Sequence, residues 1–377
     1  MSDLRYDDDE EALRDSVRAL LTAHAPWSRT LARIDGDEPY DMALWARLAG
    51  ELGLAGLPVP EEHGGAGAGF REVAVVCEEL GRAVAPVPFL GSAVLATRAL
   101  LACGEVELLE QLATGRRVAA LAVPFATAPD ARPHPVAAVP GPVLRGAVAG
   151  VADALPADVL LVVADDGLYA VDARAPGVRM TPVVSLDATR TLADVVLADA
   201  PARRIAAGPA ATDAVAAALT AGAALLASEQ VGVAQWCLET TVAHVRTRHQ
   251  FGRPIGSFQA VKHRLADVWV QLTEARAVAR HAADCLATGD PDTALAAALA
   301  QAYCAEAAVD AAQACVQLHG GIGFTWEHPA HLYLKRARSG ALALGTADRH
   351  RAALARLADL PPPEHRKEPF GVLTKQS

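Results

Sequence analysis

A short stretch rich in Gly and Pro separates two long helical patterns in the second half of the chain. It reads Arg-Thr-Arg-His-Gln-Phe-Gly-Arg-Pro-Ile-Gly over residues 246–256. Its glycines and proline break any continuous helix, so we expect two long helices joined by a basic turn. Arg248 offers a planar cation that fits a phosphate, and Phe251 offers a flat apolar ring. The residues alone favour an ordinary interhelical turn with solvated arginines.

The spacing of apolar residues changes twice along the 377-residue chain. Over residues 1–116 they recur at helical spacing. Over 117–202 they form short Val-, Leu- and Ala-rich runs cut by Pro and Gly, which favours an antiparallel β domain. Over 203–359 the helical pattern returns, and 360–377 is a charged tail. The sequence therefore predicts a mainly α fold with a central β domain. The last helical region holds predicted helices at about 211–248, 258–287, 292–318 and 329–357.

Composition excludes several classes of protein. The net charge of −10 gives no basic face for nucleic acid. Six cysteines form no Cys-x-x-Cys pair, so we expect no metal site and interpret them as buried thiols in a reducing cytoplasm. The N-terminus is acidic, unlike a signal peptide. The Ala-rich run 214–227 is short for a membrane span, so we expect a core helix and no membrane partner.

Two strings resemble the C-terminal helical domain of the flavin-dependent acyl-CoA dehydrogenases. In that family an Arg-x-x-Phe-Gly turn grips the FAD of the neighbouring subunit, and Arg248, Gln250 and Phe251 match it. Residues 316–336 resemble the second signature, whose Gln-x-x-Gly-Gly also meets the partner's FAD. The matching residues there are Gln317, Gly320 and Gly321. The resemblance implies the acyl-CoA dehydrogenase fold: an N-terminal helical domain, a middle β-barrel and a C-terminal four-helix bundle.

The resemblance also implies a reaction, in which a carboxylate removes the α-proton of an acyl-CoA and the β-hydrogen leaves as hydride to the flavin. Most members carry the base directly before a Gly-Thr pair. This chain has Leu344 there, followed by Gly345 and Thr346, the latter an expected cofactor contact. A minority place the base on the first long helix, where counting gives Gly222. Glu229 is the nearest spare carboxylate, and we expect it to pair with other side chains rather than act as the base.

The β region departs from the family at both places that contact the flavin. Members carry Thr-Glu-Pro-x-Ala-Gly-Ser-Asp where residues 122–129 read Ala-Val-Pro-Phe-Ala-Thr-Ala-Pro. They carry Trp-Ile-Thr where residues 146–149 read Gly-Ala-Val-Ala. The groups that would hold this subunit's own flavin are therefore missing, whereas those that grip a partner's FAD remain.

Three hypotheses follow. The first is one subunit of an FAD-dependent heteromeric acyl-CoA dehydrogenase, resembling the actinobacterial heteromers of steroid side-chain breakdown, with an unlike subunit supplying the base. The second is a homo-oligomeric acyl-CoA dehydrogenase with an unusual base. Both imply an acyl-CoA substrate, an electron-transfer flavoprotein or similar acceptor, and a cytoplasmic location. The third is a flavin-free acyl-CoA-binding or non-redox protein on the same fold.

Overall fold

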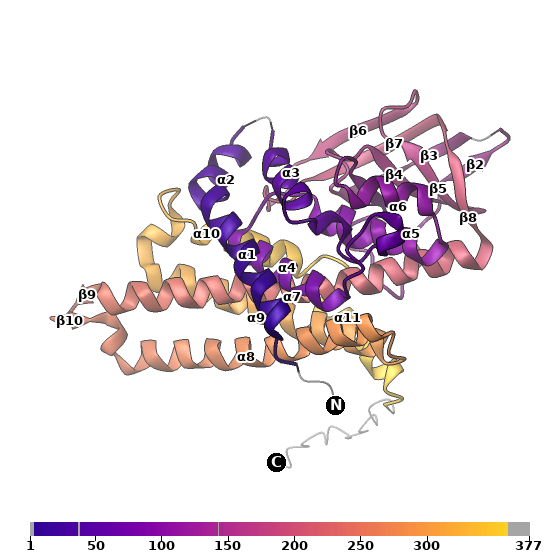
Figure 1. The fold of residues 1–377 in the computed structure, drawn as a ribbon. Coiled ribbons are helices and arrows are strands. Elements are labelled where there is room, and N and C mark those ends of the chain that lie inside the picture. Colours follow the sequence, from indigo (N-terminus) through magenta and orange to yellow (C-terminus); the bar gives the residue numbers. More distant parts are fainter. Residues whose placement is uncertain (1–3, 37, 142, 361–377) are drawn as a thin grey trace, which may run out of the picture.

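Helices occupy both ends of the chain and strands lie between them (Figure 1). The computed structural model describes residues 4–36, 38–141 and 143–360. In Figure 1 the sheets project on one side, and helices α7 and α8 extend to the opposite side, where a short hairpin joins them. This arrangement confirms the predicted fold class.

The N-terminal region is a set of short helices. They are α1 (Asp8–His24), α2 (Trp27–Ile34), α3 (Met42–Gly50), η1 (Leu54–Gly56), η2 (Glu61–His63), α4 (Phe70–Ala83), η3 (Phe89–Ala96), α5 (Thr97–Cys103) and α6 (Val106–Ala113). Helix α1 begins with a capping box, in which Asp7 and Glu10 each accept a hydrogen bond from the other's backbone N–H. Helix α2 spans only eight residues and buries little of its surface, so apolar spacing gives it little signal in the sequence. Segment η3 is a π-helix that leads directly into α5.

The central strands form two four-stranded sheets. The strands are β1 (Ala119–Ala122), β2 (Ala137–Val139), β3 (Val143–Ala152), β4 (Val159–Ala164), β5 (Gly167–Asp172), β6 (Val178–Val183), β7 (Leu192–Pro201) and β8 (Arg203–Ala207). Their orders are β1-β4-β5-β8 and β2-β3-β7-β6. Strand β1 pairs with β4 in parallel, and the other pairs within the two sheets are antiparallel. Strand β8 lies beyond residue 202, where the sequence pattern placed the end of the β domain, because it pairs with β5.

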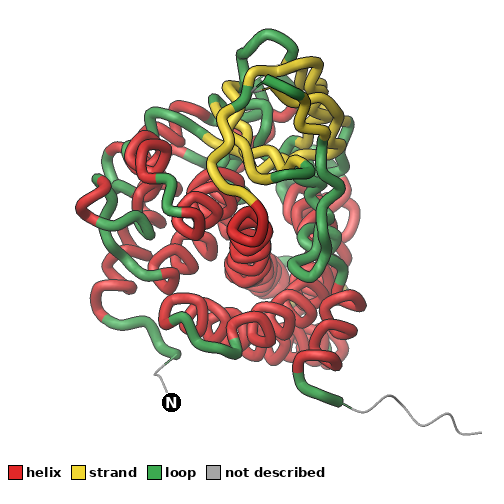
Figure 2. Tube along the Cα trace, turned by 90° about the vertical axis from the view of Figure 1, so that its right-hand side faces the viewer, coloured by secondary structure: helices red, strands yellow, loops and turns green. Residues whose placement is uncertain are grey.

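The C-terminal region is built on long helices around α7. Its elements are α7 (Gly208–Thr247), β9 (His249–Gln250), β10 (Arg253–Pro254), η4 (Ile255–Ser257), α8 (Gln259–Thr288), α9 (Thr293–His319), η5 (Gly320–Phe324), α10 (Ala330–Gly340) and α11 (Ala347–Leu357). Residues 221–234 of α7 are all buried, and Figure 2 shows this helix nearly end-on, enclosed by other helices. Among helices of the described residues, α7 alone is long and apolar enough to cross a membrane, yet 67% of that stretch is buried inside the protein. It is therefore a core helix of this fold.

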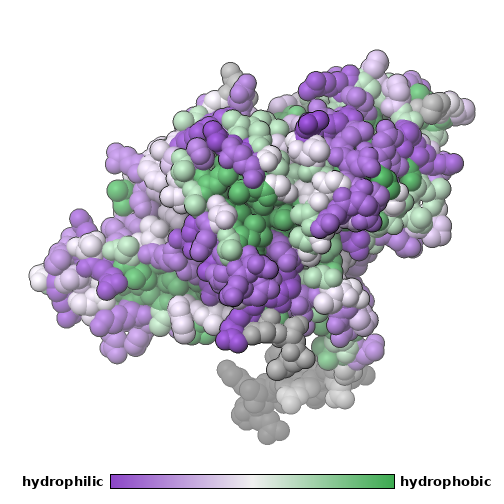
Figure 3. All heavy atoms as spheres, in the orientation of Figure 1, coloured by the Kyte–Doolittle hydropathy of each residue, from purple (hydrophilic) through white to green (hydrophobic). Residues whose placement is uncertain are grey.

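Helices α7 and α8 form an arm that carries the hairpin. Figure 3 shows hydrophobic surface between these two helices near the hairpin, and a second hydrophobic area at the middle of the molecule. Trp269 and Val270 on α8 are also exposed large apolar side chains. Exposed apolar groups of this size are typical of surfaces that another chain covers.

The fourth predicted C-terminal helix, 329–357, is wrong as a single helix, because α10 and α11 are separated by a turn. In that turn Leu344 has φ +53° and Gly345 has φ +103°. Neither conformation continues an α-helix, and the first is uncommon for a residue with a side chain. The backbone N–H of Leu344 instead donates to the carbonyl of Phe125 at 2.7 Å, which ties the turn to the β domain.

Candidate functional site

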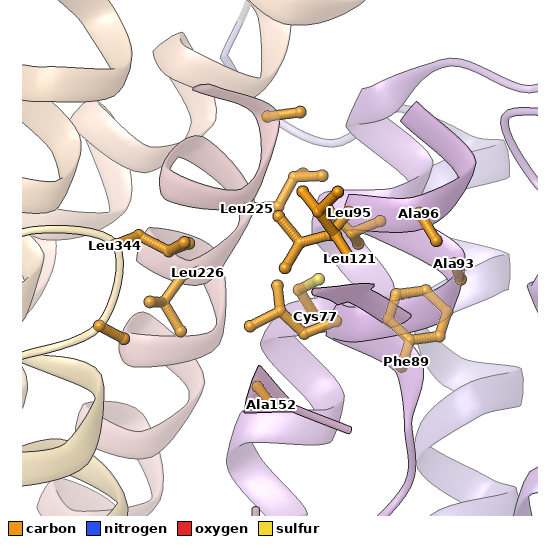
Figure 4. Packing of buried hydrophobic residues seen from close by; sticks show 14 of the residues in the cluster. Cys77, Phe89, Ala93, Leu95, Ala96, Leu121, Ala152, Leu225, Leu226 and Leu344 are labelled. Atoms are coloured by element: carbon orange, nitrogen blue, oxygen red, sulfur yellow. The ribbon is translucent and has the colours of Figure 1, made fainter. Parts of the chain in front are cut away.

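The structure brings together the two positions at which the family resemblance would place a catalytic base. Gly222 lies on α7 and Leu344 lies in the turn between α10 and α11. A Cβ atom on Gly222 would lie 3.0 Å from Cδ1 of Leu344 and 2.5 Å from Cδ2 of Leu95. Figure 4 shows Leu344 approaching α7 from one side and Leu95 lying on its other side. Both positions therefore lie next to each other in the folded chain.

The point where they meet is filled by aliphatic side chains. Leu225, Leu226 and Leu344 have no exposed surface, and Leu95 is buried as well. These side chains belong to the continuous hydrophobic core that joins the helices to the β domain. A Cβ atom on Gly222 would have to displace the ends of the Leu95 and Leu344 side chains, and none of the side chains around this point can accept a proton.

Glu229, the spare carboxylate of α7, is buried between two arginines. Its Oε2 accepts from Nη2 of Arg190 at 2.6 Å, and its Oε1 accepts from Nε of Arg336 at 2.7 Å. Burial opposes its ionisation, but the two guanidinium groups outweigh burial and lower the pKa of Glu229 to about 2. A carboxylate with this pKa is a poor proton acceptor at neutral pH. The geometry gives Glu229 a structural role.

The two arginines belong to a buried ionic cluster that sequence reasoning missed. Arg336 donates to Thr189 Oγ1 at 3.1 Å and lies 3.5 Å from Asp187. Arg190 lies over the ring of Phe125, with 5.6 Å between the guanidinium carbon and the ring centroid. The cluster ties the β6–β7 connection to α7 and α10. In the sequence both arginines look like ordinary surface residues, so no local pattern signals the cluster.

We call the two segments that match the family's FAD-contacting signatures the gripping segments, and the first of them is the hairpin after α7. Strands β9 and β10 pair antiparallel, and the turn between them places Phe251 at φ +52° and Gly252 at φ +75°. Two successive residues of positive φ make the tight turn that suits a two-residue hairpin. The ring of Phe251 is 90% exposed, with Arg248 and Gln250 exposed beside it. Phenylalanine is unusual at positive φ, and its exposed ring packs edge-on to Phe258 at 6.0 Å.

The second gripping segment lies where α9 ends. Gln317 is exposed on the last turn of α9, and Gly320 has φ +66°, a conformation that favours glycine. Gly321 is different, because its φ does not lie in the left-handed region and a Cβ atom there would meet nothing within 4 Å. No contact within the described chain requires this glycine. The open space permits close approach by a group from outside, as a bound ligand requires.

The two segments lie side by side at one end of the helical bundle. The ring of His244, one turn before Arg248, stacks on His319 with 4.3 Å between the centroids, and His319 directly precedes Gly320. Arginine, glutamine and an exposed ring next to open glycines can hold a phosphate and cover a ring. This set of groups suits a dinucleotide supplied from outside the chain.

Thr346 lies in a different place, at the N-terminus of α11. Its hydroxyl accepts from the backbone N–H of Arg349 at 3.4 Å, and it lines a groove of about 530 Å³ that Arg338 also lines. Arg338 borders a second cleft, of about 800 Å³, between the β domain and α10. The second cleft is lined mainly by apolar groups, among them Phe125, Leu192 and Leu342.

The described residues contain no group of three or more His, Cys, Asp or Glu that could hold a metal ion. The six cysteines are free thiols, and all except Cys103 are fully buried.

Comparison with known proteins identifies the family. The family models for the acyl-CoA dehydrogenase N-terminal and C-terminal domains match residues 7–115 and 212–358. The acyl-CoA dehydrogenase IpdE2 of Mycolicibacterium smegmatis is 38% identical over 342 residues, covering 90% of this chain and 95% of that protein.

Solved structures agree with the sequence matches. A chain of the ChsE4-ChsE5 complex from Mycobacterium tuberculosis has a TM-score of 0.86 and 29% identity, covering 96% of this chain and all of that chain. A variant of the Tcur3481-Tcur3483 steroid ACAD has a TM-score of 0.83 and 32% identity, covering 93% of this chain and 98% of that one. These matches confirm the resemblance inferred from the two signatures. The chain belongs to the acyl-CoA dehydrogenase family, whose members are oxidoreductases acting on the CH–CH bond of acyl-CoA thioesters.

Proposed function

We propose that this chain is one subunit of a heteromeric FAD-dependent acyl-CoA dehydrogenase, in which an unlike subunit supplies the catalytic base. One observation carries the proposal: Gly222 and Leu344, the two positions of the family's base, lie against each other in aliphatic core. A lost general base typically costs about 10²–10⁴-fold in rate. The chain alone is therefore nearly inactive toward acyl-CoA.

The partner's FAD is the cofactor that fits this chain's gripping segments. Arg248 holds a phosphate through charge-assisted hydrogen bonds, Phe251 covers a ring, and Gln317 donates from its side-chain amide. The open side of Gly321 leaves room for the dinucleotide. When bound, FAD accepts the hydride that leaves the β-carbon of the substrate.

The cleft between the β domain and α10 of this chain fits a flavin poorly. Apart from Arg338, its polar lining side chains are Ser185, Asp194 and Ser339. Asp194 already accepts a hydrogen bond from the backbone of Gly150 at 2.9 Å. An isoalloxazine ring needs donors aimed at its polar edge, and the lining offers few. The lone chain therefore binds FAD weakly and retains it only with its partner.

The partner is an unlike acyl-CoA dehydrogenase subunit. Two of the similar structures are named for paired proteins, ChsE4-ChsE5 and Tcur3481-Tcur3483. Phe324 and Trp326, which follow Gly321 in the chain, and Trp269 on α8 are exposed aromatic residues, and aromatic residues are enriched at protein interfaces. An obligate interface of this kind commonly buries roughly 2,000 Å² or more. The complex takes an acyl-CoA substrate, passes electrons to an electron-transfer flavoprotein or similar acceptor, and works in the cytoplasm.

The apolar lining of the cleft between the β domain and α10 also favours a second candidate, a flavin-free acyl-CoA-binding protein on the same fold. The visible absorption of the protein purified together with its paralogous partner separates the two. A flavin spectrum supports the dehydrogenase, and a colourless complex supports the second candidate.

The decisive variant is Arg248→Ala in the purified complex. Loss of charged hydrogen bonds of about 1.5–3 kcal/mol weakens FAD binding by roughly ten- to hundredfold. The matched control is Arg246→Ala, which removes an exposed arginine from the end of the same helix and leaves FAD bound. Equal FAD retention in the two variants would show that the hairpin does not grip the cofactor.

A further inference from the structure

Five aromatic side chains stand in a column behind the two gripping segments. In order they are Tyr333, Trp236, His328, His319 and His244. The rings of Tyr333 and Trp236 are nearly parallel, with centroids 3.6 Å apart. His328 follows at 6.4 Å from Trp236, His319 at 4.2 Å from His328, and His244 at 4.3 Å from His319. We call these five residues the aromatic column.

The column joins parts of the chain that are far apart in sequence. At its inner end the hydroxyl of Tyr333 donates to the carbonyl of Arg82, at the end of α4, at 2.7 Å. At its outer end His244 lies one turn before Arg248, and His319 directly precedes Gly320. The ring of His328 contacts the ring of His319, so the chain segment that begins at Gly320 returns to the end of α9. The column thus runs from the N-terminal helices to both gripping segments.

Hydrogen bonds fix the middle rings. Nδ1 of His319 donates to the carbonyl of Cys315 at 2.7 Å, because a carbonyl oxygen can only accept. Nδ1 of His328 accepts from the backbone N–H of Ala330 at 3.2 Å. Burial, helped by the neighbouring His319 and His244, lowers the pKa of His328 to about 4, so this ring is neutral at physiological pH. Rings held in this way have little freedom to turn.

The side chains of the gripping residues have little packing of their own. Arg248, Gln250 and Phe251 are exposed, and a Cβ atom on Gly320 or Gly321 would meet nothing within 4 Å. The stacked imidazoles continue the α7–α9 contact to the ends of both helices, next to the hairpin and to Gly320. A site whose parts are held in place before binding loses less entropy when the ligand arrives.

We propose that the outer rings of the aromatic column, His319 and His244, are positioning residues that hold the two gripping segments in the arrangement needed for the dinucleotide. This inference rests on the proposed function. It requires a flat ring at residue 319, and it does not require the imidazole's proton.

The test compares two replacements of His319 in the purified complex. Both His319→Phe and His319→Leu lose the hydrogen bond to Cys315, and only the phenylalanine keeps a ring that can stack. We expect His319→Leu to raise the dissociation constant of FAD about tenfold, since two ring contacts are lost. We expect His319→Phe to stay within about twofold of the wild type. Dissociation constants come from the recovery of flavin fluorescence on dilution.

Equal behaviour of the two variants overturns the inference, whether both lose FAD or both retain it. Because His319 is buried and its variants could fold poorly, the same two replacements, by phenylalanine and by leucine, are also made at His244, which is partly exposed. We again expect the leucine variant to have the higher dissociation constant for FAD. Arg248→Ala is measured alongside. If that variant also retains FAD, the proposed function fails; if it releases FAD while the leucine and phenylalanine variants do not differ, only the role of the column fails.

Discussion

Replacing Glu229 by glutamine removes the charge that faces Arg190 and Arg336. The difference between a folded-state pKa of about 2 and the ordinary value of 4.5 corresponds to roughly 3 kcal/mol of stability. Breaking a buried ion pair by removing one partner typically costs a similar amount, about 3–5 kcal/mol. We therefore expect Glu229→Gln to lower the free energy of unfolding by roughly 3 kcal/mol at pH 7.

The sign of the pH dependence follows from the lowered pKa. The carboxylate contributes its full stabilisation above pH 4.5, and the contribution declines as the pH falls from 4.5 toward 2. Urea unfolding measured at several pH values should therefore show the wild type and Glu229→Gln converging across this window. Glu239→Gln is the matched control on the same helix, because it breaks a more exposed pair with Arg82 and should cost less than about 1 kcal/mol.

The catalytic rate of the complex tests whether Glu229 also takes part in the reaction. Glu229→Gln should leave the rate with acyl-CoA nearly unchanged once unfolding is avoided by working at low temperature. A variant of unchanged stability whose complex no longer turns over would refute the reasoning and make Glu229 the base.

Two further predictions concern Gly222 and Leu344, the positions at which the family resemblance would place a base. Gly222→Ala should be less favourable than Gly50→Ala by about 1 kcal/mol in urea unfolding, because its added methyl group must displace the ends of the Leu95 and Leu344 side chains, whereas Gly50 ends α3 in open space. Gly50→Ala should be neutral or slightly stabilising, and equal effects of the two substitutions would contradict the packing argument. Leu344→Glu should leave the lone chain inactive in a dye-reduction assay, because a carboxylate placed there is buried in aliphatic core without room for substrate. Brisk turnover by that variant would show that only the base is missing.

Periodicity was sufficient to predict the three-part architecture. The Ala-rich α7 and the Gly/Pro stretch after it produce strong local patterns, and short apolar runs cut by Pro and Gly signal strands. Local patterns failed where tertiary contacts decide the conformation. The break between α10 and α11 depends on a hydrogen bond from Leu344 to Phe125, whose sequence position is more than 200 residues earlier.

Only the exposed parts of the candidate site carry a signal in the sequence. The gripping residues carry recognisable strings, but the contact between Gly222 and Leu344 joins positions more than 100 residues apart. The arginine cluster around Glu229 and the stacking of His244 on His319 likewise depend on how α7 packs against its neighbours. No single-sequence pattern reports such pairs, since each member is compatible with an ordinary helix surface.

In the proposed heteromer, this chain contributes half of a flavin site and no base. FAD content and turnover, measured for the lone chain and for the complex with its unlike partner, test both parts of this proposal. We expect a nearly colourless, nearly inactive lone chain and a yellow, active complex that holds one FAD for each pair of unlike subunits. A lone chain that purifies with one FAD per subunit and dehydrogenates acyl-CoA at the rate of the complex would contradict this proposal.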